Sequence, residues 1–491
     1  MSETPAVEQS VLIEAQALPA VSVGPKAPVN KTFRVYDQDQ PMLLPPDLRD
    51  WLASDHPARM VDDLVEHGLD LSAVYAGYTE VRGAPPYDPR LMLKILVYGY
   101  SHGITSSRAL ERRCQDDVAF RFLTAQAAPD FVAIARFRTR HGAALKQLFT
   151  QSLALCAQAG LVSLGRVALD GTKLRASASR HRAMSYDRMV RAEAELVGEV
   201  DRLVAEAEQI DAAEDAAYGP DRRGDELPAE LTRRTDRLAV IRKAKAALEA
   251  EHAAAARQAA AQAATERGQD DAQIAAAGEA AAQEIVVPDK AQRSFTDEDA
   301  RIMKTSDGSF HYCYNAQAIV DERSQVILAG ALRQSGADCP ALPDMLDLLQ
   351  AVLTAAGIDG LPRTLLADAG YFSAANIAAS LAAGIDPLIA TGRLKHGQSS
   401  VPAPRGRIPA GLTPKQLMAR KLRTKKGQAD YARRKAIVEP VFGQIQVAQN
   451  GDQLRLRGQV KADFENAFHH ACHNFRKLFA SDWTPSQPLL T

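Results

Sequence analysis

The sequence has no long hydrophobic run, no closely spaced pair of cysteines and almost no net charge. A membrane span needs about 18 uninterrupted apolar residues, and no stretch of the 491 residues meets that requirement. The first residues, Met-Ser-Glu-Thr-Pro, have neither the basic segment nor the apolar core of a secretory signal. The five cysteines are scattered, which is typical of a reducing cytosol. We therefore expect a cytoplasmic protein that does not enter a membrane.

The near-zero net charge hides an uneven distribution along the chain. There are 59 Lys and Arg residues against 60 Asp and Glu residues, which by itself would argue against a polyanionic partner such as DNA. However, residues 391–480 carry 18 basic and 5 acidic side chains, residues 90–146 carry 10 and 4, and residues 187–286 carry 13 and 22. Local clusters set the field that a ligand meets at a surface. The sequence thus predicts basic surfaces and one acidic segment; solvated helix faces, or pairing between the segments, are the alternative.

A helix, a short turn and a basic helix follow one another in the N-terminal third. Asp88-Pro89 is a typical helix start, with a capping carboxylate before a proline at the first helical position. Residues 103–107 then interrupt the helix. This order is compatible with a helix-turn-helix, although any helical hairpin has the same pattern. We assign to DNA contact, ahead of a packing role, the basic residues of the second helix, Arg108, Arg112 and Arg113.

After residue 164 the pattern changes to short apolar strands that alternate with helices, which indicates an α/β fold with mixed strand directions. The expected strands are 165–171, ending in a turn, a hairpin of 311–320 and 325–332, and then 364–368 and 386–390. The expected helices are a long hairpin within 184–282 that is interrupted near Tyr218, then 340–355, 430–448 and 461–479, with a basic loop over 392–427. The predicted regions are a flexible arm (1–35), an all-helical N-terminal DNA-binding domain (36–160), an α/β domain (161–480) with a helical insertion at about 187–290, and a tail (481–491).

Three carboxylates could carry chemistry. Asp170 and Asp368 each end a short apolar strand before a glycine-containing turn, and the carboxyl ends of strands in open α/β sheets border the ligand crevice. Two such carboxylates brought together repel unless a cation such as Mg²⁺ or Mn²⁺ neutralises them. Glu439 is the candidate third, since Pro440 predicts that a helix starts or kinks there. The alternatives are turn-forming or capping aspartates and a surface glutamate paired with Arg434 or Lys435.

Three ordered motifs carry a resemblance to a known family. They are Asp170-Gly-Thr-Lys-Leu-Arg-Ala-Ser-Ala-Ser179, Ala367-Asp-Ala-Gly-Tyr371 and Tyr431-x-x-Arg434 followed by Glu439-Pro-Val-Phe-Gly443. They resemble the motifs of DDE transposases from bacterial insertion sequences, most closely the IS-eleven-eighty-two-like group. The similarity covers roughly residues 33–480 and includes the segments Tyr98–Arg108, Phe137–His141, Phe295–Met303 and Tyr314–Gln317.

The resemblance implies a ribonuclease H-like catalytic core with the helical segment inserted between its first two acidic residues. Asp170, Asp368 and Glu439 would bind two Mg²⁺ ions, for which Mn²⁺ can substitute. One ion would activate a water or a 3′-hydroxyl, and the other would stabilise the leaving oxygen in attack on a DNA phosphodiester. Tyr431 and Arg434 would contact DNA phosphate. The basic residues of the first motif, Lys173 and Arg175, are also assigned to DNA binding.

The implied partners are double-stranded DNA, as terminal inverted repeats and target, and a second copy of the chain in the synaptic complex. The implied location is the cytoplasm, at the nucleoid. One residue departs from the family pattern: Gln446 stands where related proteins commonly carry a lysine. A catalytically inactive DNA-binding derivative and a plain nuclease of the same fold therefore stay open as alternatives.

Two other groups of residues were weighed against the three motifs. The histidines and cysteine of His469-His470-Ala-Cys472-His473 lack a second ligand pair with zinc spacing, so we expect a core or phosphate-facing helix. The alternative carboxylates, which stand in sequences typical of turns, are Asp297, Asp299 and Asp321.

Overall fold

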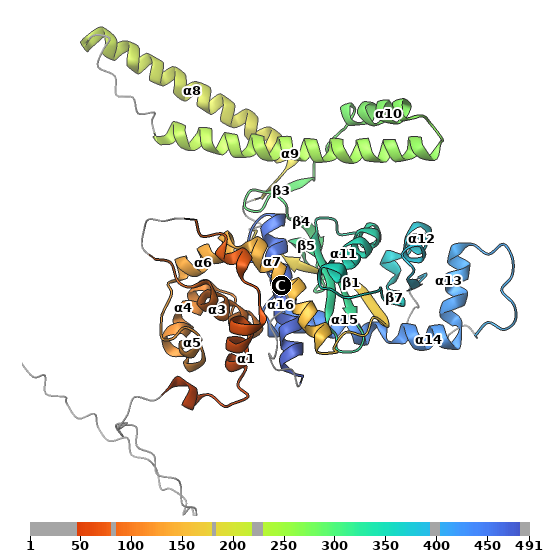
Figure 1. Cartoon of the computed structure of the whole chain (residues 1–491). Coiled ribbons are helices and arrows are strands. Elements are labelled where there is room, and N and C mark those ends of the chain that lie inside the picture. The colour runs from red at the N-terminus through yellow and green to blue at the C-terminus, as the bar shows by residue number, and fades with distance from the viewer. Residues whose placement is uncertain (1–46, 80–84, 179–182, 219–228, 393–402, 482–491) are drawn as a thin grey trace, which may run out of the picture. The chain divides into compact units, whose positions relative to one another are not determined.

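The computed structural model describes residues 47–79, 85–178, 183–218, 229–392 and 403–481, without the side chains of 206–218 and 229–232 (Figure 1). Leu48–Thr491 form one compact unit, distinct from Met1–Asp47, and every contact below lies within it. The predicted arm, and the predicted tail after its first residue, lie outside the described residues. Among the helices of the described part, none is long and apolar enough to cross a membrane.

The N-terminal third is helical throughout its described length. After a 3₁₀ turn at Leu48–Trp51 come α1 (Pro57–Asp63), which continues as a π-helical segment to Gly68, α2 (Ser72–Tyr75), α3 (Pro89–Ser101), α4 (Ser107–Asp116), α5 (Val118–Leu123), α6 (Phe131–Arg140) and α7 (Gly142–Gln158). The carboxylate of Asp88 caps α3 by accepting a hydrogen bond from the backbone N of Arg90 at 2.8 Å. The predicted helix, turn and basic helix are confirmed as α3, residues 102–106 and α4.

A mixed sheet forms the centre of the remaining chain. Its strands are β1 (Arg166–Arg175), β4 (Arg301–Lys304), β5 (Phe310–Asp321), β6 (Ile327–Arg333), β7 (Thr364–Ala367) and β8 (Asp386–Ile389). The order is β4-β5-β1-β7-β8, with β6 also paired to β5. β1 is antiparallel to β5 and parallel to β7, and β7 is parallel to β8. The predicted α/β class, its mixed strand directions and a hairpin of β5 and β6 are confirmed, although β6 begins at Ile327, two residues later than predicted.

The first strand is longer than the sequence predicted. β1 does not end in a turn at Gly171, because β5 pairs with it without a break as far as Arg175 and Cys313. Gly171 has another reason to be glycine: a Cβ at this position would lie 2.3 Å from Nε2 of Gln317. The glycine suggested a turn at this position, but it is needed because the neighbouring side chains leave no room for a Cβ.

The helical insertion contains three helices instead of a simple hairpin. They are α8 (Tyr186–Tyr218), α9 (Ala229–Glu266) and α10 (Asp271–Gln283) (Figure 1). α8 ends at the predicted interruption. Side chains of α8 and α9 form a small core of Met189, Leu196, Leu238, Ile241, Ala244 and Leu248. β2 (Ala183–Ser185) and β3 (Gln292–Ser294) pair where the insertion leaves and rejoins the fold.

The predicted basic loop over 392–427 is wrong for its second half. α13 (Pro414–Arg423) is helical, and α14 (Lys425–Ala432) begins immediately afterwards. Thr413 and Gln416 form a capping box, in which each side chain accepts a hydrogen bond from the other residue's backbone N–H. This start signal was present in the sequence, but the surrounding Pro, Gly and basic residues concealed it. Residues 393–402 lie outside the described part.

The third motif lies on a helix that continues through its proline. α15 (Arg434–Gly443) contains Pro440 in its interior, so a helix does not start at Glu439 as one form of the prediction had it. Proline leaves the carbonyl four residues earlier without its N–H donor. That carbonyl, on Ala436, instead accepts a hydrogen bond from Nε2 of Gln325 at 3.0 Å. A side chain from the β5–β6 turn thus supplies the donor that the helix lacks.

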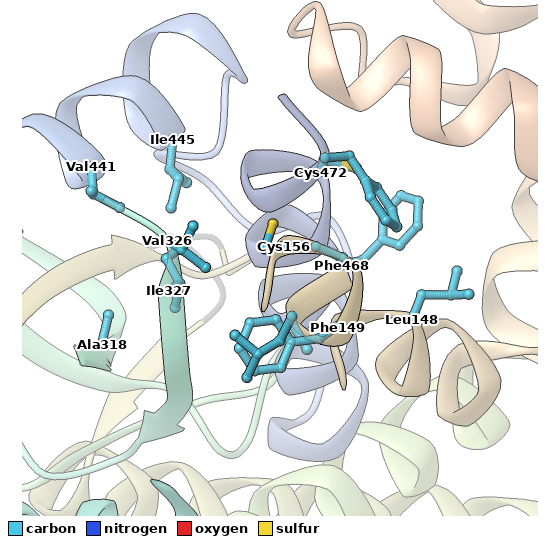
Figure 2. Close-up of a cluster of buried hydrophobic side chains, with 14 of the residues drawn as sticks. Leu148, Phe149, Cys156, Ala318, Val326, Ile327, Val441, Ile445, Phe468 and Cys472 are labelled. Carbon is cyan, nitrogen blue, oxygen red and sulfur yellow. The ribbon is translucent and has the colours of Figure 1, made fainter. Parts of the chain in front are cut away.

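The hydrophobic core is continuous between the N-terminal helices and the sheet. Figure 2 shows α7 and the final helix α16 (Gln459–Phe479) meeting the sheet around Phe149, Cys156, Ile327 and Phe468. The predicted strands 364–368 and 386–390 and the helix 340–355 correspond to β7, β8 and α11 (Leu342–Ala355). α12 (Ala374–Ala382) is capped by Ser373. Side chains on β1 therefore rest on a rigid, buried base.

Candidate functional site

Asp170 and Asp368 stand at matching positions on neighbouring strands. β1 and β7 pair in parallel register up to Leu169 and Ala367, and the two aspartates are the next residues of the chain. Parallel pairing therefore places both carboxylates next to each other at the carboxyl end of β7, as the sequence predicted. The proximity has an electrostatic effect, because the charge of Asp368 contributes to raising the pKa of Asp170.

The Asp170 carboxylate accepts a hydrogen bond on each oxygen. Oδ2 accepts from Nη1 of Arg434 at 2.7 Å, and Oδ1 accepts from the backbone N of Gly171 at 2.8 Å. Burial raises the pKa of Asp170 above its ordinary value, while the guanidinium and the backbone N–H act in the opposite direction. A positive charge beside this carboxylate therefore stabilises its ionised form.

Asp368 turns the chain at the end of β7. It caps the 3₁₀ turn Ala369–Tyr371, and its Oδ1 accepts a hydrogen bond from the backbone N of Gly370 at 2.8 Å. The side chain is half-buried. The capping bond fixes one carboxylate oxygen close to the Gly370 backbone, so the turn sets the orientation of this acidic residue.

Tyr431 and Arg434 reach the two aspartates from α14 and α15. Arg434 is buried, and the charges of both Asp170 and Asp368 act on its guanidinium. Its positive charge also acts on Tyr431, whose pKa burial raises. The residues that the third motif assigned to DNA phosphate thus lie beside the first two acidic residues, with Arg434 engaged by Asp170.

Glu439 lies on the same helix but is oriented differently. Its side chain is 53% exposed and faces Lys435, with Oε1 at 4.0 Å from Nζ. The helix is held against β1 on either side of it: Arg434 binds Asp170, and Nε2 of Gln446 donates to Oγ1 of Thr172 at 2.8 Å. Glu439 therefore lies between two contacts to β1, although its described ion pair is with a surface lysine.

Gln446, the departure from the family pattern, belongs to a π-helical segment, Gln444–Ala448, that continues α15. Its contact is to Thr172, two residues beyond Asp170 and hence on the same face of β1. π-Helical turns often occur at functional sites. In this chain the position fixes the helix to the strand through a neutral amide.

A polar network that the sequence reasoning missed lies on the other face of β1. Asp338, after β6, accepts hydrogen bonds on Oδ1 from Nδ2 of Asn315 at 2.8 Å and from Nε2 of Gln317 at 3.0 Å. The hydroxyl of Tyr371 donates to Oε1 of Gln317. Asn315, Gln317 and Tyr371 stand in the motifs quoted for the resemblance, but the sequence offered no signal that Asp338 joins them.

Lys173 and Arg175, assigned to DNA from the sequence, both have carboxylate partners. Nζ of Lys173 lies 3.4 Å from Oδ1 of Asp338 and donates to the carbonyl of Gly336 at 3.0 Å. Arg175 pairs with Asp452, which follows the π-helical segment. Lys173 is thus placed at the edge of the carboxylate site, whereas Arg175 joins the end of β1 to the C-terminal segment.

The basic side chains of α4 are exposed, away from the carboxylates. The guanidinium of Arg108 lies over the ring of Phe131, 4.9 Å from its centroid, and Arg113 pairs with Asp117 at 3.3 Å. Arg112 and Arg113 border a cavity of about 430 Å³ between the turn before α4 and Asn450. Arg138 of α6, in contrast, is buried and donates to Thr105 and Ser107, so it holds the turn in place.

The alternative carboxylates have structural partners. Asp297 and Asp299 accept hydrogen bonds from the backbone N atoms of Gly458 and Gln459, at 3.2 and 2.8 Å, and so cap the start of α16. Asp321 accepts from the backbone N atoms of Leu164 and Arg323, at 3.0 and 2.8 Å. These bonds tie the β5–β6 turn to the segment before β1.

The histidine cluster of α16 belongs to the core, one of the two expected environments. His469, His470 and His473 are all at least 98% buried. Nε2 of His473 lies 2.9 Å from the carbonyl O of Gln325, and a Cβ on Gly330 would lie 2.3 Å from the His470 ring. Burial lowers the pKa of His469 and of His473 to about 3 and that of His470 to about 4.

The donors at the edge of the sheet fit a hard divalent cation. A Cβ on Gly370 would lie 3.0 Å from Oδ1 of Asp368 and 3.5 Å from Oδ2 of Asp338, so glycine leaves a space there that carboxylate oxygens border. Such oxygens are the ligands that Mg²⁺ and Mn²⁺ prefer. Within the described ranges, no group of three or more His, Cys, Asp or Glu side chains is already arranged around one metal position. Asp170 and Asp368 are the two carboxylates best placed to hold such an ion.

Comparison with known proteins gives two matches that fit this geometry. Residues 46–140 match the family described as Transposase domain (DUF772), and residues 282–475 match the family described as Transposase DDE domain. The second match contains Asp368, Tyr431, Arg434 and Glu439. No curated protein and no solved structure matches the chain. The two family matches, in this order along one chain, support an insertion-sequence transposase of the DDE type.

Proposed function

We propose that the chain is a DNA transposase of the IS-eleven-eighty-two-like group, with a ribonuclease H-like catalytic core. It cleaves phosphodiester bonds at the ends of an insertion sequence and transfers the 3′ ends to target DNA by two-metal-ion catalysis. Asp170, Asp368 and Glu439 are its acidic residues. Its substrates are terminal inverted repeats and target DNA, and it acts in the cytoplasm, at the nucleoid, as a homodimer in the synaptic complex.

One observation carries the proposal: the parallel register of β1 and β7 aligns Asp170 with Asp368, and Arg434 of the third motif binds Asp170. The three motifs are separated by roughly 200 and 70 residues in the sequence, so their convergence depends on the fold. A central strand with an acidic residue, flanked by antiparallel and parallel neighbours, supports the ribonuclease H-like assignment. Glu439 is included because α15 is fixed to β1 on both sides of it.

The acidic residues would hold two divalent ions, Mg²⁺ or Mn²⁺. When bound, these ions act as Lewis acids that stabilise the attacking and leaving oxygens of an in-line displacement at phosphorus. The chain's own contribution is to fix Asp170 and Asp368 side by side on two paired strands and to favour the ionised form of Asp170 through the guanidinium of Arg434, against the effect of burial.

The basic residues supply the remaining contacts to DNA. Tyr431, Arg434 and Lys173 lie at or near the carboxylates and would bind the phosphates next to the cut. Arg175, at the far end of β1 beside Asp452, would bind DNA farther from the cut. The exposed residues of α4, Arg108, Arg112 and Arg113, would bind DNA at a distance from the cut. Each phosphate contact releases counterions, so the affinity falls as salt rises.

The test is cleavage of a DNA fragment that carries the native ends of the element, by the full chain with Mg²⁺. Asp170→Asn, Asp368→Asn and Glu439→Gln are expected to abolish cleavage while mobility-shift assays still detect DNA binding. Asp347→Asn, which removes an exposed carboxylate from α11, is the matched control and is expected to cleave as the parent does. Undiminished cleavage by any of the three variants would refute the role of that residue.

Two alternatives predict different products in the same assay. A catalytically inactive DNA-binding derivative, suggested by Gln446, would bind the ends and show no metal-dependent nicking. A plain nuclease of the same fold would hydrolyse the ends without joining them to a target. Sequencing of the joined products, with short duplications of the target, distinguishes transposition from both.

A further inference from the structure

The cavity of about 430 Å³ at the start of α4 is built by two parts of the chain that are far apart in the sequence. Residues 103–106 and one face of α4 line it on one side, and Asn450 lines it on the other. Gly103 brings the two sides together: its φ is 75°, and a Cβ there would lie 2.9 Å from the carbonyl O of Ala448. The helical N-terminal third and the segment that follows the third motif thus share this cavity.

The first turn of α4 offers backbone donors to the cavity. Leu110 is the first residue of the helix whose N–H bonds to the preceding turn, at the carbonyl of Ser106. The three N–H groups before it, of residues 107–109, have no acceptor among the described residues, and Ser106 makes no capping bond with its side chain. The start of a helix attracts anions, because free N–H groups and the helix dipole both favour negative charge.

A buried hydroxyl in the lining of the cavity also has no partner. Thr105 is only 2% exposed, yet its Oγ1 makes no hydrogen bond within the described part of the chain. The turn that carries it is held firmly, since Arg138 donates to the carbonyl of Thr105 at 2.8 Å and to Oγ of Ser107 at 2.7 Å. A buried hydroxyl without a partner lowers stability. An oxygen of a ligand in the cavity would supply the missing acceptor.

The cavity is positively charged along α4. Arg112 and Arg113 line it, and side chains of a helix lean toward its N-terminus, so both extend toward the free N–H groups. Arg113 pairs with Asp117 at 3.3 Å, whereas Arg112 has no carboxylate partner in the described ranges. The one carboxylate of the lining, Asp116, is ten residues beyond Ser106, about 15 Å along the helix axis. A free guanidinium and free N–H groups are the donors that a phosphate prefers.

We propose that this cavity binds a backbone phosphate of duplex DNA. The N–H groups at the start of α4, the hydroxyl of Thr105 and the guanidinium of Arg112 donate to the phosphate oxygens, and Asn450 closes the opposite side. The inference rests on the proposed function, which makes DNA the partner. It goes beyond that function by assigning a phosphate site that does not read the base sequence and that includes residues outside the basic set of α4.

The place of the cavity gives the bound phosphate a role in positioning. Asn450 follows the π-helical segment Gln444–Ala448, in which Gln446 contacts Thr172 of β1. Thr172 stands two residues beyond Asp170 on the same strand. Phosphate contacts fix the register and orientation of DNA on a protein without reading its sequence. A phosphate held in the cavity therefore sets the position of the duplex relative to the strand that carries Asp170.

The experiment measures the affinity of the full chain for two duplexes of equal length, without a divalent metal, by fluorescence anisotropy over a range of NaCl concentrations. One duplex carries an end of the element and the other an unrelated sequence. Arg112→Gln is expected to bind both about 10-fold more weakly and to reduce the slope of log affinity against log salt by about 0.9, the value for one phosphate. Arg188→Gln, which removes an exposed arginine of α8, is the matched control and is expected to change neither quantity.

Thr105→Val separates a binding role of the hydroxyl from a structural one. The variant is expected to bind both duplexes about 3- to 10-fold more weakly. Its free energy of unfolding in urea is expected to equal or exceed that of the parent, because the lost hydroxyl has no partner in the fold. Lower stability with parent-like affinity would overturn the inference, since the hydroxyl would then serve the fold.

The remaining outcomes separate this inference from the proposed function. If Arg112→Gln and Thr105→Val bind DNA like the parent while the parent cleaves the ends of the element, the inference is overturned and the proposed function stands. A loss confined to the duplex with the element's end would overturn it in favour of base recognition. Thermal stabilisation by inorganic phosphate that Arg112→Gln abolishes, with parent-like DNA affinity, would overturn it in favour of a small anion. The expected losses in a chain that does not cleave would support the phosphate site and refute the transposase.

Discussion

Acidification is expected to destabilise the protein through the buried histidines of α16. His469, His470 and His473 are enclosed in the core that joins α16 to α7 and the sheet, and burial lowers the pKa of each from its ordinary 6.5 to about 3 or 4. The unfolded chain then binds more protons than the folded chain at any pH between these values. Their contribution to stability is fully present above about pH 6.5 and is lost as the pH falls through this window.

The magnitude follows from the size of the window. Each histidine changes the free energy of unfolding by about 1.4 kcal/mol per pH unit between its two pKa values. At about pH 5, one and a half units below the unfolded value, each costs about 2 kcal/mol, and the three together cost about 6 kcal/mol. This is a large part of the roughly 5–15 kcal/mol that stabilises a typical domain. The raised pKa of the buried Glu465 has the opposite sign and offsets part of the loss.

The assay is urea denaturation between about pH 5 and pH 7.5, followed by circular dichroism, with the slope of the unfolding free energy against pH as the readout. His473→Gln is the informative variant, because a glutamine nitrogen can take the place of Nε2, which lies 2.9 Å from the carbonyl of Gln325. The variant is expected to lower the slope by about 1.4 kcal/mol per pH unit. His67→Gln, which replaces an exposed histidine, serves as the control and should leave the slope unchanged.

A pH-independent free energy of unfolding across this range would refute the reasoning. A slope in His473→Gln equal to that of the parent chain would also refute it, because it would mean that His473 is protonated in the folded protein as readily as in the unfolded chain. That result would favour a solvent-accessible or ion-paired environment for α16, in contrast to the buried one.

Three further predictions concern stability and can be read from the same denaturation experiments. Arg434→Met leaves a largely buried carboxylate without its cation and is expected to cost about 3 kcal/mol, whereas an exposed ion pair would cost less than 1 kcal/mol. Gln325→Leu is expected to cost about 1 kcal/mol in the parent and less beside Pro440→Ala, which restores the missing N–H; the hydrogen bond from Lys477 to Gln325 is lost in both backgrounds, so equal costs in the two would refute the compensation. Gly330→Ala places a methyl 2.3 Å from a buried imidazole and should destabilise by about 1–3 kcal/mol, whereas Gly198→Ala, with open space around it in α8, should stabilise by about 0.5–1 kcal/mol.

The sequence predicted the elements of the fold more successfully than their lengths. Local signals such as the Asp88-Pro89 cap and the apolar alternation of the β5–β6 hairpin act within a few residues, so the sequence reveals them. Two errors had tertiary causes. β1 continues past Gly171 because β5 pairs with it, and α15 continues through Pro440 because Gln325 supplies the missing donor. Neither partner lies near these positions in the sequence.

The residues of the candidate site were also predicted only in part from the sequence. Asp170 and Asp368 were found from the sequence because each follows a short apolar run. Asp368 does follow β7, whereas Asp170 lies within β1, and the parallel pairing of the two strands brings them into register. Arg434 was assigned to DNA phosphate, whereas in the structure its guanidinium binds Asp170. Asp338 carries no local signature of a functional residue, since an aspartate before a helix is an ordinary capping residue. Its place in the polar network with Asn315 and Gln317 arises from the return of the chain after β6, which no pattern within a window of residues encodes.

The charge distribution can be reconsidered with the ion pairs in view. Carboxylates of the acidic insertion pair with basic residues of the insertion itself and of the strands at its base: Glu193 with Arg242 and Lys245, and Glu251 with Arg293 and Arg301. Charges act on a ligand over about 8 Å at physiological ionic strength. These pairs neutralise part of the acidic excess of the insertion, and screening limits the reach of the rest, so the basic C-terminal segment keeps a positive field of its own. The neutral total of 59 against 60 is thus compatible with DNA binding, since a DNA phosphate meets the charge of one surface and not the sum over the chain.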